Sequence, residues 1–376
     1  MTAVSEALLS IDAAALNDVA EPLAGLVEPA GVLRHFQAHP PQGFATFVAQ
    51  GAPAFAGCFD LLTTAEQSVR QTVCRLPGYR HWSRLLQPTT CFVGSTVTEY
   101  ALWPSTRSPR EFVGALKRDQ ARRFPFLIIK DIPYRSPLLG EAMNAQAEAL
   151  VDACRAEEFL LVQGQALAYL PIDFASIDAY LARLSAGRRK DLRRKLRARA
   201  EVTVEQIATG HACFFVPEFV AECYGLYLEV YRQSTQHFDL LSAEFFAAVL
   251  QDASYAGVVF IYRRAGQMIG WNLCFETGGR LIDKYIGLRY PAARDVNLYF
   301  TSWIHNIEYA LQRGLNCYVA GWSDPEVKAS LGAQFTFTRH AVHIRSRLLR
   351  AALRPLRSRF EADKNWFDAL ECTSGA

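Results

Sequence analysis

The chain has 376 residues, of which 51% are hydrophobic and 20% are charged. This composition supplies a large core and excludes an intrinsically disordered protein. The formal net charge is only +3, which excludes a histone-like basic protein and a protein with a long acidic tail. At about 100 to 200 residues per domain, the length allows two domains or one large one.

The nine cysteines never form a C-x-x-C pair, so neither a disulfide framework nor a structural zinc site is expected. No metal ligand set is predicted from the histidines either. The first basic residue is Arg34 and no apolar run reaches about 20 residues, so neither a signal peptide nor a membrane-spanning helix is predicted. These features favour a cytoplasmic protein.

In the first half of the chain, short strands alternate with helices. The Ala- and Leu-rich opening, interrupted by prolines, predicts short helices and loops up to about residue 40. Strands are predicted at 44–49, 91–94, 126–132 and 159–163. Helices are predicted at 64–73, 108–118 and 142–156.

The second half repeats this alternation more clearly. Helices are predicted at 177–199, 216–233 and 238–250, and a strand at 202–207. A meander of three strands follows at 257–262, 268–275 and 280–287. A helix over 297–312, ended by Gly314, then leads to a strand at 317–320, a short helix at 325–331 and a strand at 335–344. The alternation predicts an α+β fold, with α and β elements in layers.

Four segments give this order of elements a more specific meaning. They are Leu-Ser-Ala-Gly-Arg-Arg-Lys-Asp-Leu-Arg-Arg-Lys-Leu-Arg at 184–197, Lys-Tyr-Ile-Gly-Leu at 284–288, Asn-Leu-Tyr-Phe at 297–300, and Gly-Trp-Ser-Asp-Pro-Glu-Val-Lys at 321–328 followed by Gly332. Together they resemble the acyl-transferring GNAT superfamily, and within it the FemAB-like branch, of the BioF2-like and peptidoglycan-biosynthesis type. The resemblance covers residues 176–348, whereas 40–170 agree only in element order.

The resemblance implies two tandem GNAT-like lobes, each with a mixed, mostly antiparallel sheet flanked by helices. The expected lobes are 1–170 and 171–376, and the second is expected to carry the catalytic site and a basic C-terminal helix. The activity implied is that of an N-acyltransferase, whose acyl group is acetyl or another group. The co-substrate implied is acyl-CoA or another acyl carrier, with no tightly bound cofactor.

Three residues are candidates for catalysis. Acyl transfer to an amine needs a base and a group that stabilises the oxyanion. Asp283 is the candidate base because apolar and aromatic residues flank it, and strand alternation predicts that it shares a face with Leu281 and Tyr285, opposite Lys284. Tyr285 is a candidate donor to the oxyanion or the leaving group. Pairing of Asp283 with a cation, and a core role for Tyr285, remain alternatives.

Lys328 is a catalytic candidate by resemblance, since a lysine at this place in FemAB-like proteins lies close to the donor site; a surface lysine is the alternative. The same resemblance places a donor phosphate at the start of the helix after the meander. Its candidate ligands are Arg289, Arg294 and Asn297. The glycine-containing loop of CoA-dependent members is absent here, because a Pro-Ala-Ala run takes its place, so a solvated arginine loop is the alternative.

The small net charge is the sum of two basic segments and an acidic remainder of the chain. Residues 188–199 carry eight cations against Asp191 alone, and 345–359 carry six arginines between leucines, so the rest of the chain has a net charge of −10. Lys190 and Arg194 in the first segment are candidates to bind a nucleotide-bearing donor, an acceptor-stem RNA or an acyl carrier protein; a solvated helix is the alternative. The second segment predicts either contact with an anionic membrane surface or a helix covering the core.

Three further residues are candidates to bind the acceptor. His237 and Asp239 precede a predicted helix, and Trp271 lies in the meander. An ordinary helix entry is the alternative for the first two residues.

The leading hypothesis is transfer of an acyl or aminoacyl group from acyl-CoA or acyl carrier protein to an amine by direct attack. The alternatives are a FemX-like transferase that uses aminoacyl-tRNA, and a non-catalytic GNAT-like protein that binds anions or membranes. No G-x-G-x-x-G follows a predicted strand and no P-loop is present, which disfavours a dehydrogenase and a kinase. DNA is not expected as a partner.

Overall fold

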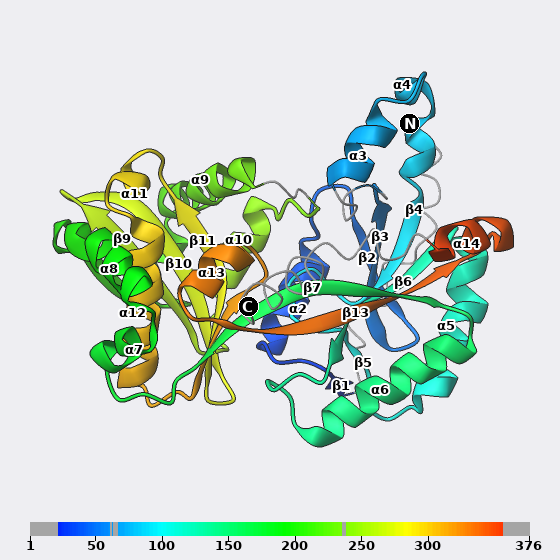
Figure 1. The fold of residues 1–376 in the computed structure, drawn as a ribbon, viewed down its shortest axis with the longest axis horizontal. Helices are drawn as coiled ribbons and strands as arrows, with labels where there is room; N and C mark the ends of the chain where they lie inside the picture. Colours follow the sequence, from blue (N-terminus) through cyan, green and yellow to red (C-terminus); the bar gives the residue numbers. More distant parts are fainter. Residues whose placement is uncertain (1–21, 61, 63–66, 235–237, 356–376) are drawn as a thin grey trace. The chain divides into compact units, whose positions relative to one another are not determined.

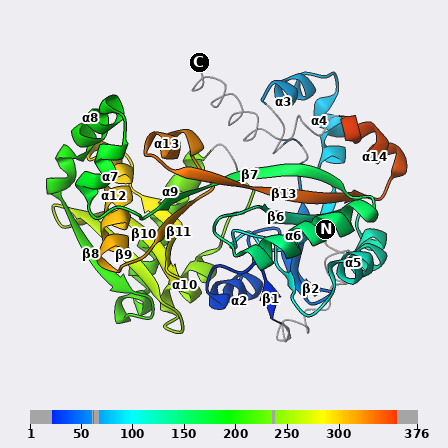
Figure 2. The same ribbon diagram turned by 60° about the horizontal axis from the view of Figure 1, so that its bottom comes forward.

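The computed structural model describes residues 22–60, 62, 67–234 and 238–355 (Figures 1 and 2). The chain divides into two compact units. The first comprises the chain up to Leu26, Phe36–Ala166 and the chain from Thr336 onward, and the second comprises Val27–His35 and Leu167–Phe335. This division differs from the expected lobes 1–170 and 171–376, because the last strand of the chain returns to the first unit.

The first unit is built on a mixed arrangement of strands. The spatial order is β2 (Ala45–Ala49), β3 (Ala52–Cys58), β4 (Thr89–Val93), β6 (Phe126–Tyr134), β13 (Gln334–Ile344) and β7 (Leu160–Pro171). β4 and β6 are parallel, whereas the pairs β2–β3, β3–β4 and β6–β13 are antiparallel. The strand β3 was absent from the sequence prediction. A separate two-stranded ladder joins β1 (Leu23–Ala24) to β5 (Trp103–Pro104).

Two helices form much of the core of the first unit. α5 (Pro109–Arg123) starts where Ser108 accepts a hydrogen bond from the backbone N–H of Glu111 and Pro109 takes the first turn. It packs with α6 (Glu141–Ala156), and both contribute apolar side chains to one buried cluster. The remaining helical segments are α2 (Ala30–Ala38), which has residues in both units, α3 (Gln67–Cys74), α4 (Tyr79–Trp82), η2 (Ser83–Leu86) and α14 (Arg347–Leu353).

The second unit contains the predicted meander. Its sheet has the order β7, β12 (Cys317–Gly321), β11 (Arg280–Leu288), β10 (Gln267–Thr277), β9 (Gly257–Arg264) and β8 (Val202–Ala208). β11 and β12 are parallel, and the other neighbouring pairs are antiparallel. The predicted α+β class, with mixed and mostly antiparallel sheets flanked by helices, is confirmed.

Helices cover both faces of the second unit's sheet (Figure 1). On one face lie α7 (Ile177–Arg183), α8 (Ala186–Lys195) and α12 (Leu298–Gln312), and η3 (Leu196–Glu201) contacts α12. On the other lie α9 (Pro217–Gln233) and α10 (Ala243–Gln251), which η4 (Ala212–Phe215) contacts. The helix predicted over 177–199 is interrupted, because Ser185 caps a new helix by accepting a hydrogen bond from the backbone N–H of Arg188.

Two short helices complete the second unit. α11 (Ala292–Asp295) lies between β11 and α12, and α13 (Pro325–Ser330) follows β12. The predicted strand and helix order after the meander is therefore present. Ser323 and Lys328, from the connection after β12 and from α13, line the candidate site.

Candidate functional site

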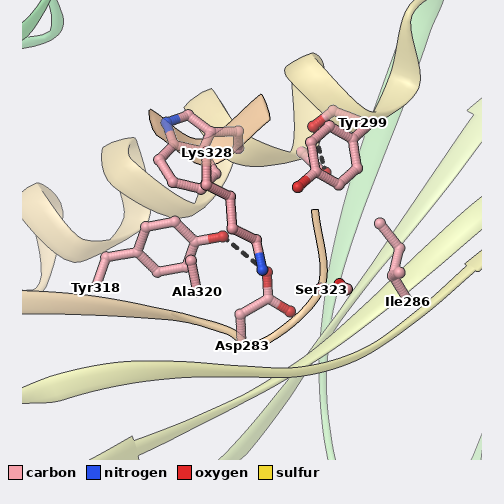
Figure 3. A pocket seen from close by; sticks show the side chains of 9 residues that line it. Asp283, Ile286, Tyr299, Tyr318, Ala320, Ser323 and Lys328 are labelled. Atoms are coloured by element: carbon pink, nitrogen blue, oxygen red, sulfur yellow. Dashed lines mark hydrogen bonds between the residues drawn. The ribbon is translucent and has the colours of Figure 1, made fainter. Parts of the chain in front are cut away.

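A cavity of about 50 Å³ lies in the second unit where two parallel strands stop pairing (Figure 3). The last paired residues of β11 and β12 are Ile282 and Val319. The space beyond them holds a few water molecules or a small acyl group. The lining residues are Asp283, Ile286, Tyr299, Ser302, Trp303, Tyr318, Ala320, Ser323 and Lys328.

Asp283 is fixed in this cavity by neutral hydrogen-bond donors. The hydroxyl of Tyr318 donates to Oδ2 of Asp283 at 2.7 Å. The amide of Asn272 donates to Oδ1 at 2.6 Å, and that of Asn306 donates to Oδ2 at 3.1 Å. Such donors stabilise the negative charge of a carboxylate and hold its orientation.

Tyr318 remains a hydrogen donor at neutral pH. Burial, with the nearby charge of Asp283, raises the pKa of its hydroxyl well above the ordinary value. Asn306 also donates to this hydroxyl oxygen at 3.1 Å. The network of Asp283, Tyr318, Asn272 and Asn306 therefore joins β10, β11, β12 and α12.

Lys328 enters the same cavity from α13. The residue is 3% exposed, and its ammonium group donates to the carbonyl of Gly321 at 3.1 Å. Figure 3 shows this ammonium directed toward the carboxylate of Asp283. Gly321 has a φ of 78°, a conformation that favours glycine. The structure thus brings together two of the three residues predicted for catalysis.

Tyr285 lies on the opposite face of the sheet, and the predicted shared face is wrong. Leu273 pairs with Tyr285, whereas the next residue, Cys274, pairs with Asp283, so Lys284 forms a β-bulge. A bulge shifts the alternation of side chains by one residue. Tyr285 packs edge-on against Phe246 under α10, and it does not line the cavity.

In the loop predicted to hold a donor phosphate, both arginines bind other groups of the protein. The guanidinium of Arg289 donates to Glu222 at 2.6 Å and to the carbonyl of Met268 at 2.9 Å. Arg294 donates to Gln233 and lies over the ring of Tyr290 at 4.7 Å. Asn297 occupies the N-cap position of α12, with a φ of 50° and no capping hydrogen bond from its side chain.

The remaining predicted site residues lie away from the cavity lining. Lys190 and Arg194 are exposed on α8, where Arg194 pairs with Asp191 at 2.5 Å. Trp271 is fully buried and donates its indole N–H to the carbonyl of Cys223 at 2.7 Å. Asp239 is partly exposed before α10.

His237 falls outside the described residues. Within the ranges that the structure describes, no group of three or more His, Cys, Asp or Glu residues could hold a metal ion. In the same part of the chain, no helix has both the length and the apolar character needed to cross a membrane.

The sequence prediction missed Tyr318, Asn272 and Asn306. Asn272 interrupts an otherwise apolar strand and Asn306 lies on the buried face of α12. A fully buried amide requires partners, so these two residues carried a signal. Tyr318 carried none, because a tyrosine in a buried strand is ordinary core.

No curated protein matches the chain. Solved structures with a similar fold include the C-terminal domain of a putative lysylphosphatidylglycerol synthetase from Agrobacterium fabrum, with 11% identity, a TM-score of 0.52 and coverage of 93% of this chain and 97% of that one. The L-PGS of Bacillus licheniformis has 10% identity, a TM-score of 0.51 and coverage of 89% and 97%.

The structure of FemX has 12% identity to this chain, a TM-score of 0.49, and coverage of 90% of this chain and 96% of that one. A family model matches residues 134–365, and its description is FemAB-like, peptidoglycan biosynthesis/recognition. This match spans more than half of the sequence and confirms the predicted resemblance: the chain belongs to the FemAB-like family.

Proposed function

We propose that this protein transfers an aminoacyl or other small acyl group from an activated carrier to an amine, in the cavity between β11, β12, α12 and α13. The observation that carries the proposal is the convergence of Asp283, Tyr318 and Lys328 on one small cavity at the point where two parallel strands separate. A carbonyl group placed in this cavity would be next to the ammonium of Lys328 on α13 and the carboxylate of Asp283 on β11.

The reaction requires one new bond and one broken bond. The amine nitrogen attacks the acyl carbon, so a C–N bond forms and the bond from carbon to the carrier oxygen or sulfur breaks. The nitrogen loses a proton and the leaving oxygen or sulfur gains one. No covalent enzyme intermediate is required.

Lys328 and Asp283 have complementary roles in this proposal. The ammonium of Lys328 stabilises the negative charge that develops on the carbonyl oxygen, which is most effective in a site that excludes water. Asp283 accepts the proton of the attacking amine. Tyr318, Asn272 and Asn306 position the carboxylate, and the hydroxyl of Tyr318 provides a route by which that proton leaves Asp283.

We further propose an aminoacyl ester of tRNA as the donor in preference to acyl-CoA. Arg289 and Arg294, the cations of the loop between β11 and α12, are engaged by Glu222 and Gln233. That loop also lacks glycines that would let a pyrophosphate approach the backbone.

The basic helix α8 supports the same donor. The guanidinium of Arg188 on α8 reaches the carbonyl of Ala329 at 3.4 Å, next to Lys328 on α13. Lys190, also on α8, is exposed. Arg188, which reaches the helix that carries Lys328, and the exposed Lys190 provide cations for the phosphates of an RNA carrier. One of the similar folds belongs to a protein named as a putative lysylphosphatidylglycerol synthetase, whose named product carries an aminoacyl group.

The experiment is a panel of donors offered to the intact chain. Charged tRNA, an acyl-CoA and an acylated carrier protein, each with a labelled acyl group, are mixed with hydroxylamine as a small amine acceptor. Enzyme-dependent transfer from charged tRNA, which weakens steeply as salt rises, supports both parts of the proposal. Transfer only from acyl-CoA rejects the tRNA donor, and transfer from none of the three rejects the transferase.

A further inference from the structure

The end of the last strand in the first unit leads into a helix that exposes leucine. α14 begins after Ser346, whose hydroxyl accepts a hydrogen bond from the backbone N–H of Leu349 at 3.3 Å. Leu348 is 86% exposed and Leu349 is 38% exposed. Transfer of an aliphatic side chain as exposed as that of Leu348 from water to an apolar phase lowers the free energy.

Arginines surround these two leucines. Arg345, Arg347 and Arg354 are exposed on or beside α14. The guanidinium of Arg345 donates to the backbone carbonyl of Arg122 at 3.1 Å, and its backbone N–H donates to the carbonyl of Pro125 at 3.0 Å. These bonds fix the start of α14 beside the end of α5, where Arg122 is also exposed.

The surface formed by Arg122, Arg345, Arg347, Leu348, Leu349 and Arg354 is named the α14 patch. Among the described residues, none of its four arginines forms an ion pair, whereas Arg350 pairs with Glu158 at 3.1 Å. The α14 patch is therefore a cationic surface with apolar side chains at its centre.

This combination selects one class of partner. Arginines around exposed leucines are typical of segments that lie on an anionic bilayer, where the leucines enter the acyl boundary and the arginines contact headgroup phosphates. RNA offers phosphates but no apolar phase for Leu348. A second copy of the same patch would oppose like charges.

We propose that the α14 patch is a peripheral docking surface for anionic phospholipid membranes. The docking does not depend on the transferase function, because every residue of the patch belongs to the first unit and the candidate cavity lies in the second. Arginine charge supplies the long-range attraction, which salt screens, and Leu348 supplies the short-range apolar contact.

The test is co-sedimentation of the full chain with vesicles of phosphatidylcholine, with and without roughly one third phosphatidylglycerol. Binding to the anionic vesicles alone is expected. Replacement of both Arg347 and Arg354 by Gln should weaken it by roughly 30-fold, from about fivefold for each charge. Leu348→Ser should weaken it by about tenfold.

Matched controls keep the result interpretable. Arg110→Gln removes an exposed arginine at the other end of α5, and Phe215→Ser removes a 60% exposed apolar residue of the second unit. Both controls should bind vesicles like the unaltered protein. All variants should unfold within about two degrees of it, since exposed side chains contribute little to stability.

Each of four results would overturn the proposal, and the first three concern binding. These are absence of binding to anionic vesicles, equal binding of the patch variants and the controls, and binding of a homopolymeric RNA to the patch without binding of vesicles. A large drop in melting temperature for Leu348→Ser, with unchanged vesicle binding, would also contradict it, because that side chain would then be packed within the protein.

Discussion

The hydroxyl of Tyr318 and the carboxylate of Asp283 meet at 2.7 Å where β11 and β12 cease to pair. The hydrogen bond joins a paired residue of β12 to the first residue of β11 beyond the ladder, and it fixes one oxygen of the carboxylate. Because the other oxygen is held by Asn272, Asp283 keeps one orientation in the cavity.

Tyr318→Phe should lower kcat by roughly 10- to 100-fold with little change in KM, because the proton acceptor loses a positioning donor. It should also destabilise the protein by about 1–3 kcal/mol, since Asp283 would lose a buried partner. Tyr285→Phe is the matched control, removing a hydroxyl from the opposite face of the same sheet. Equal loss of activity in both variants would contradict the assignment of Tyr318.

Lys328→Met should lower kcat by about 10²- to 10³-fold, the range seen when one oxyanion-stabilising group is removed. Lys328→Arg should recover only part of the rate, because a planar guanidinium does not fit the position of a compact ammonium. The control is Glu326→Gln, an exposed change on the same helix, which should leave kcat unchanged. The measurement is the steady-state rate of each variant with the preferred donor. Full activity of Lys328→Met would reject the role of Lys328 in stabilising the oxyanion.

Glu28 and Lys284 form a buried ion pair at 3.2 Å, with side chains 0% and 7% exposed. Glu28→Ala should destabilise folding by about 3–5 kcal/mol, because the buried ammonium of Lys284 would lose its ion pair with the carboxylate of Glu28. Combining Glu28→Leu with Lys284→Met should recover most of that loss. Urea unfolding measures both, and a double variant no more stable than the single one would contradict the coupling.

Burial lowers the pKa of His305 from 6.5 to about 4. Between these values the unfolded chain binds a proton that the folded chain does not, so stability falls as pH falls through this window. From pH 7 to pH 5 the loss attributed to His305 is about 2 kcal/mol. His305→Phe should remove it while keeping the ring contact with Phe260.

The measurement for His305 is urea unfolding at both pH values. The control is His81→Gln at an exposed position, which should leave the pH dependence as it is in the unaltered chain. A His305→Phe variant that loses the same stability on acidification as the unaltered protein would show that other groups cause the loss.

Much of the second unit followed from sequence patterns. The three strands of the meander, the helix after it and the strand that precedes Lys328 are where periodicity predicted them. Their apolar runs are long and regular, and turn residues such as Ala265 and Gly266 separate them. β3 escaped prediction because Ala52–Cys58 contains alanine, proline and glycine in place of the β-branched residues that favour strands.

Two features could not be predicted from local patterns. The bulge at Lys284 depends on pairing between β10 and β11, and it decides that Asp283 faces the cavity while Tyr285 does not. The pairing partner of β13 is also a long-range property. β13 has an ordinary strand pattern, and it pairs with β6 in the first unit. A strand's sequence does not specify its neighbour in the sheet.

Single-turnover transfer from charged tRNA to hydroxylamine tests whether acyl transfer takes place in the cavity of the second unit. The unaltered chain is compared with Asp283→Asn, Lys328→Met and Tyr285→Phe. We expect Asp283→Asn and Lys328→Met each to slow the transfer by at least about 100-fold. Tyr285→Phe should react at the unaltered rate. Transfer at that rate by both Asp283→Asn and Lys328→Met would show that the cavity of the second unit is not the place where the acyl group is transferred.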